Sequence, residues 1–552
     1  MIALEYHDAT KHHFNRFARS LGYLDWSTQP DPFRRYADAP LVELPRAALA
    51  GPVPYDDLFV PFDVASGFSR KKPRPIDIDS IGEFLRCSMG LSAWKQFGSS
   101  RWALRVNPSS GNLHPTETYV IWQGRVCHYA VREHALEERC VLDDAAWAPY
   151  QSAFLVALTS IHWREAWKYG ERAFRYCQHD AGHAIGALRL AAALLGWRLA
   201  LLPRWSHAQL ATMLGTDRDR DFVAAEPEEP ECIAIVTAGD PHPWMDRDPS
   251  TLVSAAAGAA WRGVANQLSR DRVAWPIIDE VAEATRYPGV AADDARGANL
   301  VRLAPQDSGG SDSRNARETI LHRRSALAFD ARGTLSRDAF LSMLGRLQPD
   351  APPWDAIDWP PHVHLALFVH RVEDLVPGVY AYLREPSVLD QWRAAMNPAF
   401  LWERINDPNG PNDPNVPNDP NVGLFLLVPI DCRRAANRVS CDQEIAEDGF
   451  FSLAMLARFE ATLRERGEWM YRRLFWECGL IGQVLYLEAE AVRARATGIG
   501  CFYDNPVHDL LGLTGHAWQS LYHFSMGVPV EDTRLTTEPG YPWEATKDTK
   551  TV

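Results

Sequence analysis

Three short clusters carry residue types that suit the binding of an anion or of a flat ring. At Arg323-Arg324-Ser325 two guanidinium groups stand beside a hydroxyl, and arginine offers paired charge-assisted donors to a dianion such as phosphate. Residues 107–115 place small polar groups between prolines, so that bare amides and hydroxyls could approach a planar, hydrogen-bonding ring. Gly498 and Gly500 let the backbone turn tightly and present amide donors.

Each cluster also has a plainer interpretation. Residues 107–115 would serve equally well as a Ser-Gly turn that leads into a strand. Arginine pairs are common on the surfaces of helices, and a glycine after a helix is often only its C-cap. The residues alone therefore leave the function of each cluster open.

Hydrophobic patterns predict the elements that position these clusters. Residues 181–197 and 478–492 are apolar on nearly every helical face, which predicts two helices buried on most sides. Short runs rich in strand-forming residues predict strands at 117–122, 152–161, 232–239, 362–370 and 423–430. Strands flanked by long helices predict a layered α+β fold.

The two predicted helices belong to an internal repeat. At a shift of 297 positions the segment around residues 170–192 overlays residues 467–489 without a gap. Matching pairs include Gly170 and Gly467, Arg175 and Arg472, Gly182 and Gly479, and, further on, Gly215 and Gly512. Because the register continues beyond one helix, we infer a degenerate duplication.

Length and composition predict a two-domain globular protein. A chain of 552 residues exceeds what one core usually supports. Its net charge of −14 argues against nucleic acid or an anionic membrane as the main partner. Nine dispersed cysteines without a CxxC pair predict reduced thiols, and a polar N-terminus without any bilayer-length apolar run predicts a cytoplasmic protein.

Two segments of the predicted domain order have the composition of loops. The Pro-rich stretch 406–421 is expected to be a surface insertion, and the Gly-, Asp- and Ser-rich stretch 288–310 to join the halves. The predicted parts are an N-terminal extension (1–60), a first domain (61–245), a connecting segment (246–310), a second domain (311–530) and a C-terminal tail (531–552). For the tail, an extended arm and disorder are both open.

In this order, the three clusters resemble the flavin-binding elements of the nitroreductase superfamily. Segments at residues 6–12, 163–184 and 375–382 narrow the resemblance to the SagB-type branch, whose best-known members oxidise azoline rings in ribosomal peptides to azoles. The likeness spans about residues 1–530. It implies two nitroreductase-like domains, FMN as cofactor, a modified peptide or small molecule as substrate, and NAD(P)H or O2 as candidate redox partners.

The resemblance also implies how the two halves share the flavin. In the family FMN lies at a two-fold dimer interface, with the arginine and glycine elements from one protomer and the PSxGN loop from the other. Here the first half has only the loop, and the second half has only the other two elements. We therefore predict an intrachain pseudo-dimer with one intact FMN site. Its expected residues are Pro108, Ser109, Ser110, Gly111, Asn112, Arg323, Arg324, Ser325, Arg495, Gly498, Ile499 and Gly500.

Proton transfer needs a separate group. The Lys-Tyr pair of the family corresponds to Lys168 and Tyr169, and we expect the lysine to act as a base towards the substrate. The plainer interpretation is a surface lysine beside a core tyrosine. His114, His179 and His183 are alternative acid–base groups, and no residue spacing indicates a metal site.

The predicted function is that of an FMN-dependent oxidoreductase. Two alternatives stay open at this stage. One is a general NAD(P)H-dependent nitro or quinone reductase, which rapid bleaching of the flavin by NAD(P)H would indicate. The other is a catalytically silent flavin-binding subunit of a biosynthetic complex, against which Lys168 and Tyr169 count.

Overall fold

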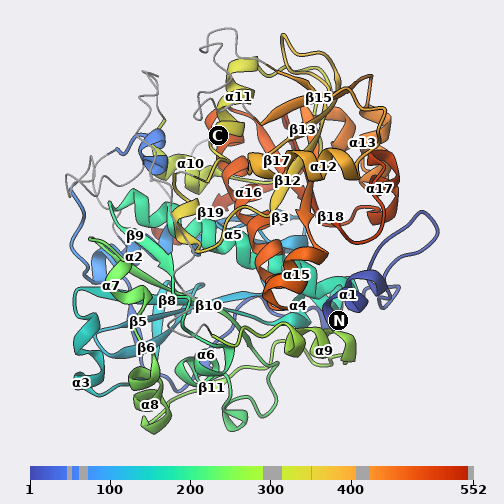
Figure 1. The fold of residues 1–552 in the computed structure, drawn as a ribbon. Coiled ribbons are helices and arrows are strands. Elements are labelled where there is room, and N and C mark those ends of the chain that lie inside the picture. The colour runs from blue at the N-terminus through green and yellow to red at the C-terminus, as the bar shows by residue number, and fades with distance from the viewer. Residues whose placement is uncertain (47–51, 61–71, 290–313, 350, 406–422, 545–552) are drawn as a thin grey trace. The chain divides into compact units, whose positions relative to one another are not determined.

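A computed structural model describes residues 1–46, 52–60, 72–289, 314–349, 351–405 and 423–544. The chain divides into two compact units (Figure 1). Unit 1 consists of residues 1–19, 323–351 and 360–532, and unit 2 of residues 20–322, 352–359 and 533–552. The insertion predicted at 406–421 and most of the linker predicted at 288–310 lie outside the described residues.

Unit 2 is built on a seven-stranded antiparallel sheet in the order β2-β7-β6-β5-β8-β10-β9. The strands are β2 (Leu41–Glu43), β5 (Thr116–Trp122), β6 (Arg125–Ala130), β7 (Ala135–Val141), β8 (Ala153–Ser160), β9 (Arg198–Leu201) and β10 (Glu229–Thr237). Helix α5 (Ala173–Leu194) packs against β5, β8 and β9 and is buried along nearly its whole length. Alternate strand residues form a second core with α6 (His207–Leu214) and α8 (Ser250–Gly258). The sheet therefore lies between helices in this unit.

Unit 1 has a seven-stranded antiparallel sheet of its own, in the order β14-β15-β13-β12-β16-β18-β17. The strands are β12 (Val363–Val369), β13 (Gly378–Tyr382), β14 (Glu403–Arg404), β15 (Leu424–Pro429), β16 (Phe451–Arg458), β17 (Arg495–Ile499) and β18 (Trp518–Gly527). Helix α16 (Met470–Ala491) packs against β12, β17 and β18. Helices α12 (Leu389–Ala395), α13 (Arg433–Val439) and α17 (Asp504–Leu511) enclose a separate core.

Six of the seven strands in each sheet have the same order and connectivity; the edge strands differ, because β2 precedes β5 in the chain whereas β14 lies between β13 and β15. Strands β5, β6, β7, β8, β9 and β10 occupy the places that β12, β13, β15, β16, β17 and β18 occupy in the other sheet. Helices α5 and α16 have the same 22-residue length and begin at residues 173 and 470. Helices α6 and α17, eight residues each, begin at 207 and 504. The shift of 297 positions inferred from the sequence thus also relates the helices of the two units.

The chain ends differ from the predicted segments. Helix α1 (Ile2–Ala9) belongs to unit 1, whereas residues from Ser20 onwards belong to unit 2, so residues 1–60 are not one extension. Residues 536–539 form β19, which pairs with β3 (Leu91–Phe97) of unit 2, and β3 in turn pairs with β4 (Ser100–Arg105). The sequence left an extended arm and disorder open for the tail, and residues 536–539 form an extended arm. No helix in the described ranges is long and apolar enough to cross a membrane.

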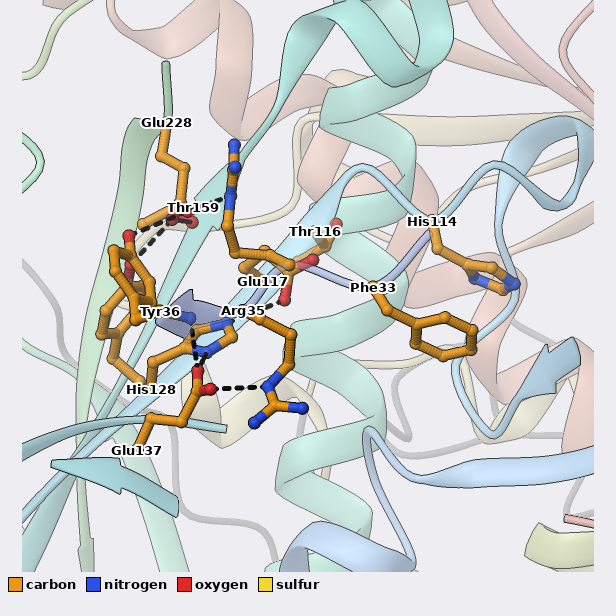
Figure 2. A network of polar contacts seen from close by, with 12 residues as sticks. Phe33, Arg35, Tyr36, His114, Thr116, Glu117, His128, Glu137, Thr159 and Glu228 are labelled. Carbon is orange, nitrogen blue, oxygen red and sulfur yellow. Dashed lines mark hydrogen bonds and ion pairs between the residues drawn. The ribbon is translucent and has the colours of Figure 1, made fainter. Parts of the chain in front are cut away.

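A buried polar network fixes residues 34–36 on the sheet of unit 2 (Figure 2). The ring of His128 lies between two carboxylates, 3.1 Å from Glu117 Oε2 and 2.9 Å from Glu137 Oε2. The Arg35 guanidinium donates to Glu137 at 2.6 Å, and the Tyr36 hydroxyl donates to Glu228 at 3.0 Å. These contacts explain why this segment folds with unit 2, because buried charges require partners.

The protonated form of His128 is expected to stabilise unit 2. Burial by itself would lower the pKa of His128, but hydrogen bonds to Glu117 and Glu137 and the charges of both outweigh it and raise the pKa to about 9. Since the folded-state pKa is the higher one, this contribution is fully present below about pH 6.5 and is lost as the pH rises through 9. At most it amounts to about 3 kcal/mol.

The measurement is the urea midpoint of unfolding at pH 6.5 and pH 9. We expect the urea midpoint of the wild type to fall between pH 6.5 and pH 9. The midpoint of His128→Gln should be lower than that of the wild type at pH 6.5 and should fall less between the two pH values. The exposed His242, which pairs with Asp240 at 2.6 Å, gives the control variant His242→Gln. Equal pH dependence in the wild type and His128→Gln would contradict the prediction.

Candidate functional site

The loop of residues 107–115 in unit 2 connects β4 to β5 and is held on helix α5. The Ser110 amide and hydroxyl both donate to the Asp180 carboxylate at 3.0 Å. The Asn112 side-chain amide donates to the Ala103 carbonyl at 2.9 Å, so its nitrogen is already engaged. Gly111 has φ of 59°, in the left-handed region that favours glycine. The loop is thus fixed by hydrogen bonds within unit 2.

Lys168 and Tyr169 lie against this loop. They end helix α4 (His162–Tyr169), which Gly170 terminates with φ of 56°. A Cβ atom placed on Gly111 would be 2.5 Å from the Tyr169 hydroxyl and 3.2 Å from Lys168 Nζ. The lysine amine is 5.3 Å from the centre of the Tyr169 ring, and both side chains are partly exposed. The structure therefore brings the predicted acid–base pair and the predicted ring-binding loop together.

Gly111→Ala is expected to disturb this contact. A methyl group would meet the Tyr169 hydroxyl at 2.5 Å, and the left-handed backbone itself disfavours alanine. We expect a loss of about 1–2 kcal/mol in stability, with displacement of Tyr169. Thermal unfolding and the fluorescence of any bound flavin would report the two effects. Gly98→Ala, at φ of 58° with nothing within 4 Å, is the matched control for backbone strain alone; equal effects of the two variants would contradict the predicted clash.

Two buried carboxyl groups behind the loop were not predicted. Glu165 lies one helical turn before Lys168, is fully buried, and neither of its oxygens has a hydrogen-bond partner among the described residues. Burial raises the pKa of Glu165, the charge of Asp180 raises it further, and Lys168 opposes the rise. Burial also raises the pKa of Asp180 to about 7, although Ser109 and Ser110 donate to it. Strongly shifted carboxyl groups beside a candidate base are typical of functional sites.

Sequence offered only a partial signal for this pair. Glu165 and Lys168 are three residues apart on one helix, so a shared face could have been expected. Nothing in the sequence places Asp180, on the next helix, beside them. Of the alternative acid–base groups, His114, His179 and His183 are all buried, and burial holds the pKa of His114 well below its usual value. This environment favours a neutral His114.

In unit 1 the predicted anion-binding residues gather around Tyr486 of α16. Helix α10 (Ala316–His322) ends directly before Arg323, and Ser325 pairs in parallel with Ala496 of β17. The Tyr486 hydroxyl lies 3.0 Å from Ser325 Oγ and accepts from the Gly498 amide at 2.9 Å. The Arg323 guanidinium lies over the Tyr486 ring, 5.0 Å from its centre. The structure thus brings Arg323, Ser325 and Gly498 together, through a tyrosine that was not predicted.

A second unpredicted residue, Glu490, lies one turn after Tyr486. Its carboxylate accepts from the Arg324 amide at 3.1 Å and lies 3.7 Å from Arg495. Arg495 also pairs with the exposed Glu531 at 2.5 Å. An exposed pair of this kind contributes little, so Arg495 can exchange Glu531 for another anion at small cost. Tyr486 and Glu490 share a helix face, which their four-residue spacing indicates.

The glycine cluster differs from its predicted form. Gly498 and Ile499 end strand β17, whereas helix α16 ends earlier, at Ala491. The C-cap alternative is wrong, because α16 ends well before Gly498, and Gly498 lies in an extended strand and not in a turn. Pairing with β18 extends the backbone here. Glycine is needed at 498 for space, because a Cβ atom would lie 1.9 Å from the Tyr522 hydroxyl. Ile499 is a core residue.

Comparison with known proteins agrees with this fold. Residues 72–227 match the model of the Nitroreductase family. A putative nitroreductase from Anabaena variabilis ATCC 29413 is similar in structure over 96% of this chain and 99% of its own, with a TM-score of 0.65 at 19% identity. No curated protein matches the chain. The chain therefore contains a nitroreductase-family domain and has a nitroreductase-like, mixed α/β fold.

Other solved structures are similar over less of the chain. The E. coli microcin synthetase McbBCD complex with truncated pro-MccB17 covers 46% of this chain and 87% of its own, with a TM-score of 0.27 at 16% identity. A point mutant of the FMN- and NADPH-dependent nitroreductase NfnB, from a Sphigopyxis strain, covers 38% and 86%, with a TM-score of 0.19 at 19% identity. Structural similarities that cover so little of the chain establish nothing about it.

Proposed function

We propose that this protein is an FMN-dependent oxidoreductase, built as an intrachain pseudo-dimer of two nitroreductase-like domains with one flavin site. The observation that carries the proposal lies inside the segment that matches the Nitroreductase family. There Lys168 and Tyr169 contact the Gly111 loop, so that a candidate base and a candidate ring-binding surface are adjacent. The shared connectivity of six strands in the two sheets supports the pseudo-dimer.

The residues present fit FMN. Burial lowers the pKa of Arg323, and the charge of Arg495 lowers it further, while Tyr486 and Glu490 oppose this. Arg323 is therefore a buried cation that a bound dianion would stabilise. Arg323, Arg324 and Ser325 would hold the phosphate, with the more weakly engaged Arg495 as a helper. The loop of residues 108–112 would line the ring. Bound FMN would supply the hydride acceptor of the reaction.

The protein residues have separate tasks in this proposal. Lys168 accepts a proton from the substrate at Nζ, and Tyr169, which lies beside the lysine amine against the same glycine, orients that amine. Asp180 positions the loop through its hydrogen bonds to Ser110. Glu165, buried beside Lys168, carries a proton more readily than an exposed carboxyl group does. This division assigns proton handling to α4 and α5.

Flavin content tests the proposal directly. The purified protein should be yellow and should release FMN on denaturation, at one FMN per chain. A value of two per chain would contradict a pseudo-dimer with one intact site, and a chain that takes up no FMN would contradict the proposed function. Quantification by chromatography of the released flavin against protein concentration gives the ratio.

The substrate class we propose is a peptide that carries an azoline ring, which is oxidised to an azole. This part rests on the resemblance of residues 6–12, 163–184 and 375–382 to SagB-type dehydrogenases. A thiazoline-bearing peptide should lose two hydrogens, measured by mass spectrometry. If NAD(P)H instead bleaches the flavin rapidly and the peptide stays unchanged, a general nitro or quinone reductase is the better description. FMN binding without either reaction would indicate a flavin-binding subunit.

A further inference from the structure

Three side chains far apart in sequence meet at one point of unit 1. His12 follows helix α1, Cys441 follows α13, and Cys501 lies between β17 and α17. One ligand atom of each lies within 4.8 Å of the other two. The two sulfur atoms are 3.0 Å apart, and Cys501 Sγ is 3.8 Å from His12 Nδ1. We propose that His12, Cys441 and Cys501 bind a zinc ion.

The donor set suits zinc chemically. Two thiolates and one imidazole are soft and borderline ligands, and Zn2+ takes them in a tetrahedron with zinc–sulfur distances of about 2.3 Å. Two thiolates on one zinc ion are then about 3.8 Å apart, so the sulfur atoms here need to separate by less than 1 Å. Three protein ligands leave the fourth position to water or to a further ligand.

Hydrogen bonds hold the three ligand segments in place. The Gln443 side-chain amide donates to the carbonyls of Ser440, at 2.8 Å, and of Cys501, at 3.0 Å, which ties the two cysteine segments together. The His12 amide donates to Asp504 Oδ2 at 2.8 Å, and the Asp504 amide donates to the His12 carbonyl at 3.0 Å. Support of this kind is what orients the ligands of a metal site.

The two cysteines of the site are partly exposed, whereas His12 is buried. Cys441 and Cys501 are the two cysteines of the chain that are not buried, and the other seven are. A cavity of about 200 Å³ borders the site at His12; it is lined by Asp8, Lys11, His12, His13, Arg16 and Asn505. Metal binding would join the N-terminal segment to the segment that follows β17. The proposal does not depend on flavin binding.

Zinc titration of the reduced full-length chain tests the site. We expect one Zn2+ per chain, and Co2+ in its place should give a thiolate-to-cobalt charge-transfer band. Cys441→Ser/Cys501→Ser should lose both signals, and His12→Asn should weaken zinc binding at least tenfold. His13→Asn, which changes a neighbouring histidine of the same cavity, should bind normally. Reduced wild type that binds no zinc at micromolar concentration, or a double variant that binds like the wild type, overturns the proposal.

A second measurement needs no variant. In the native protein a thiol reagent should modify two cysteines, Cys441 and Cys501, because the other seven are buried. Zinc should slow the modification of both, and peptide mapping would identify them. If zinc leaves their reactivity unchanged, or if the two cysteines are joined to each other in freshly reduced protein, they do not form a zinc site.

Discussion

Arg323→Ala/Ser325→Ala protein is expected to be purified colourless. Arg323 is buried over the Tyr486 ring and Ser325 lies exposed beside it, so the two provide a charged and a neutral donor on one face. A hydrogen bond to a charged group contributes roughly 1.5–3 kcal/mol. Losing both donors should weaken FMN binding by about a hundredfold or more. Quenching of FMN fluorescence on titration with apoprotein measures the affinity.

Two further variants make this result specific. Arg332→Ala removes an exposed arginine a few residues along the same segment and should leave FMN affinity unchanged. Ser325→Ala alone changes an exposed side chain, so it should weaken binding without affecting folding. If the double variant retains FMN while circular dichroism shows it folded, the assignment of the phosphate to these residues is wrong.

The predicted elements that match the structure are those with a strong hydrophobic pattern. The runs at 117–122 and 362–370 fall within β5 and β12 apart from flanking residues, and the apolar helices became α5 and α16. Burial imposes such patterns along the chain itself, so one sequence suffices to detect them. The 297-residue shift was detectable for the same reason, since both copies must fill an equivalent core.

The parts that escaped prediction depend on contacts between distant segments. Glu165 and Asp180 become a pair only when α4 and α5 pack, and His12 meets Cys441 and Cys501 across more than 400 residues of chain. The Gly498 cluster was misjudged because glycine is read first as a turn former, whereas here it makes room for Tyr522. Local patterns cannot distinguish a glycine needed for its φ from one needed for its size.

Lys168→Ala is the variant expected to separate binding from chemistry. Its amine lies beside the Gly111 loop, and Lys168 is not one of the residues proposed to hold the phosphate. The variant should therefore keep the colour of bound FMN, while turnover of a thiazoline peptide falls by about 10²–10⁴, the usual contribution of a positioned base. Lys95→Ala, which removes the lysine of β3 in the same unit, should be fully active.

The pH dependence of turnover distinguishes this base from a residue that only positions it. Above about pH 7 the Asp180 carboxyl group is charged and accepts more strongly from Ser110, so the loop is held more firmly and turnover should rise through this pH. Asp180→Asn should remove this step from the profile. Lys168→Ala should lower the rate at every pH instead. Wild-type turnover in Lys168→Ala would exclude Lys168 as the base, and a step near pH 7 that persists in Asp180→Asn would exclude Asp180 as its origin.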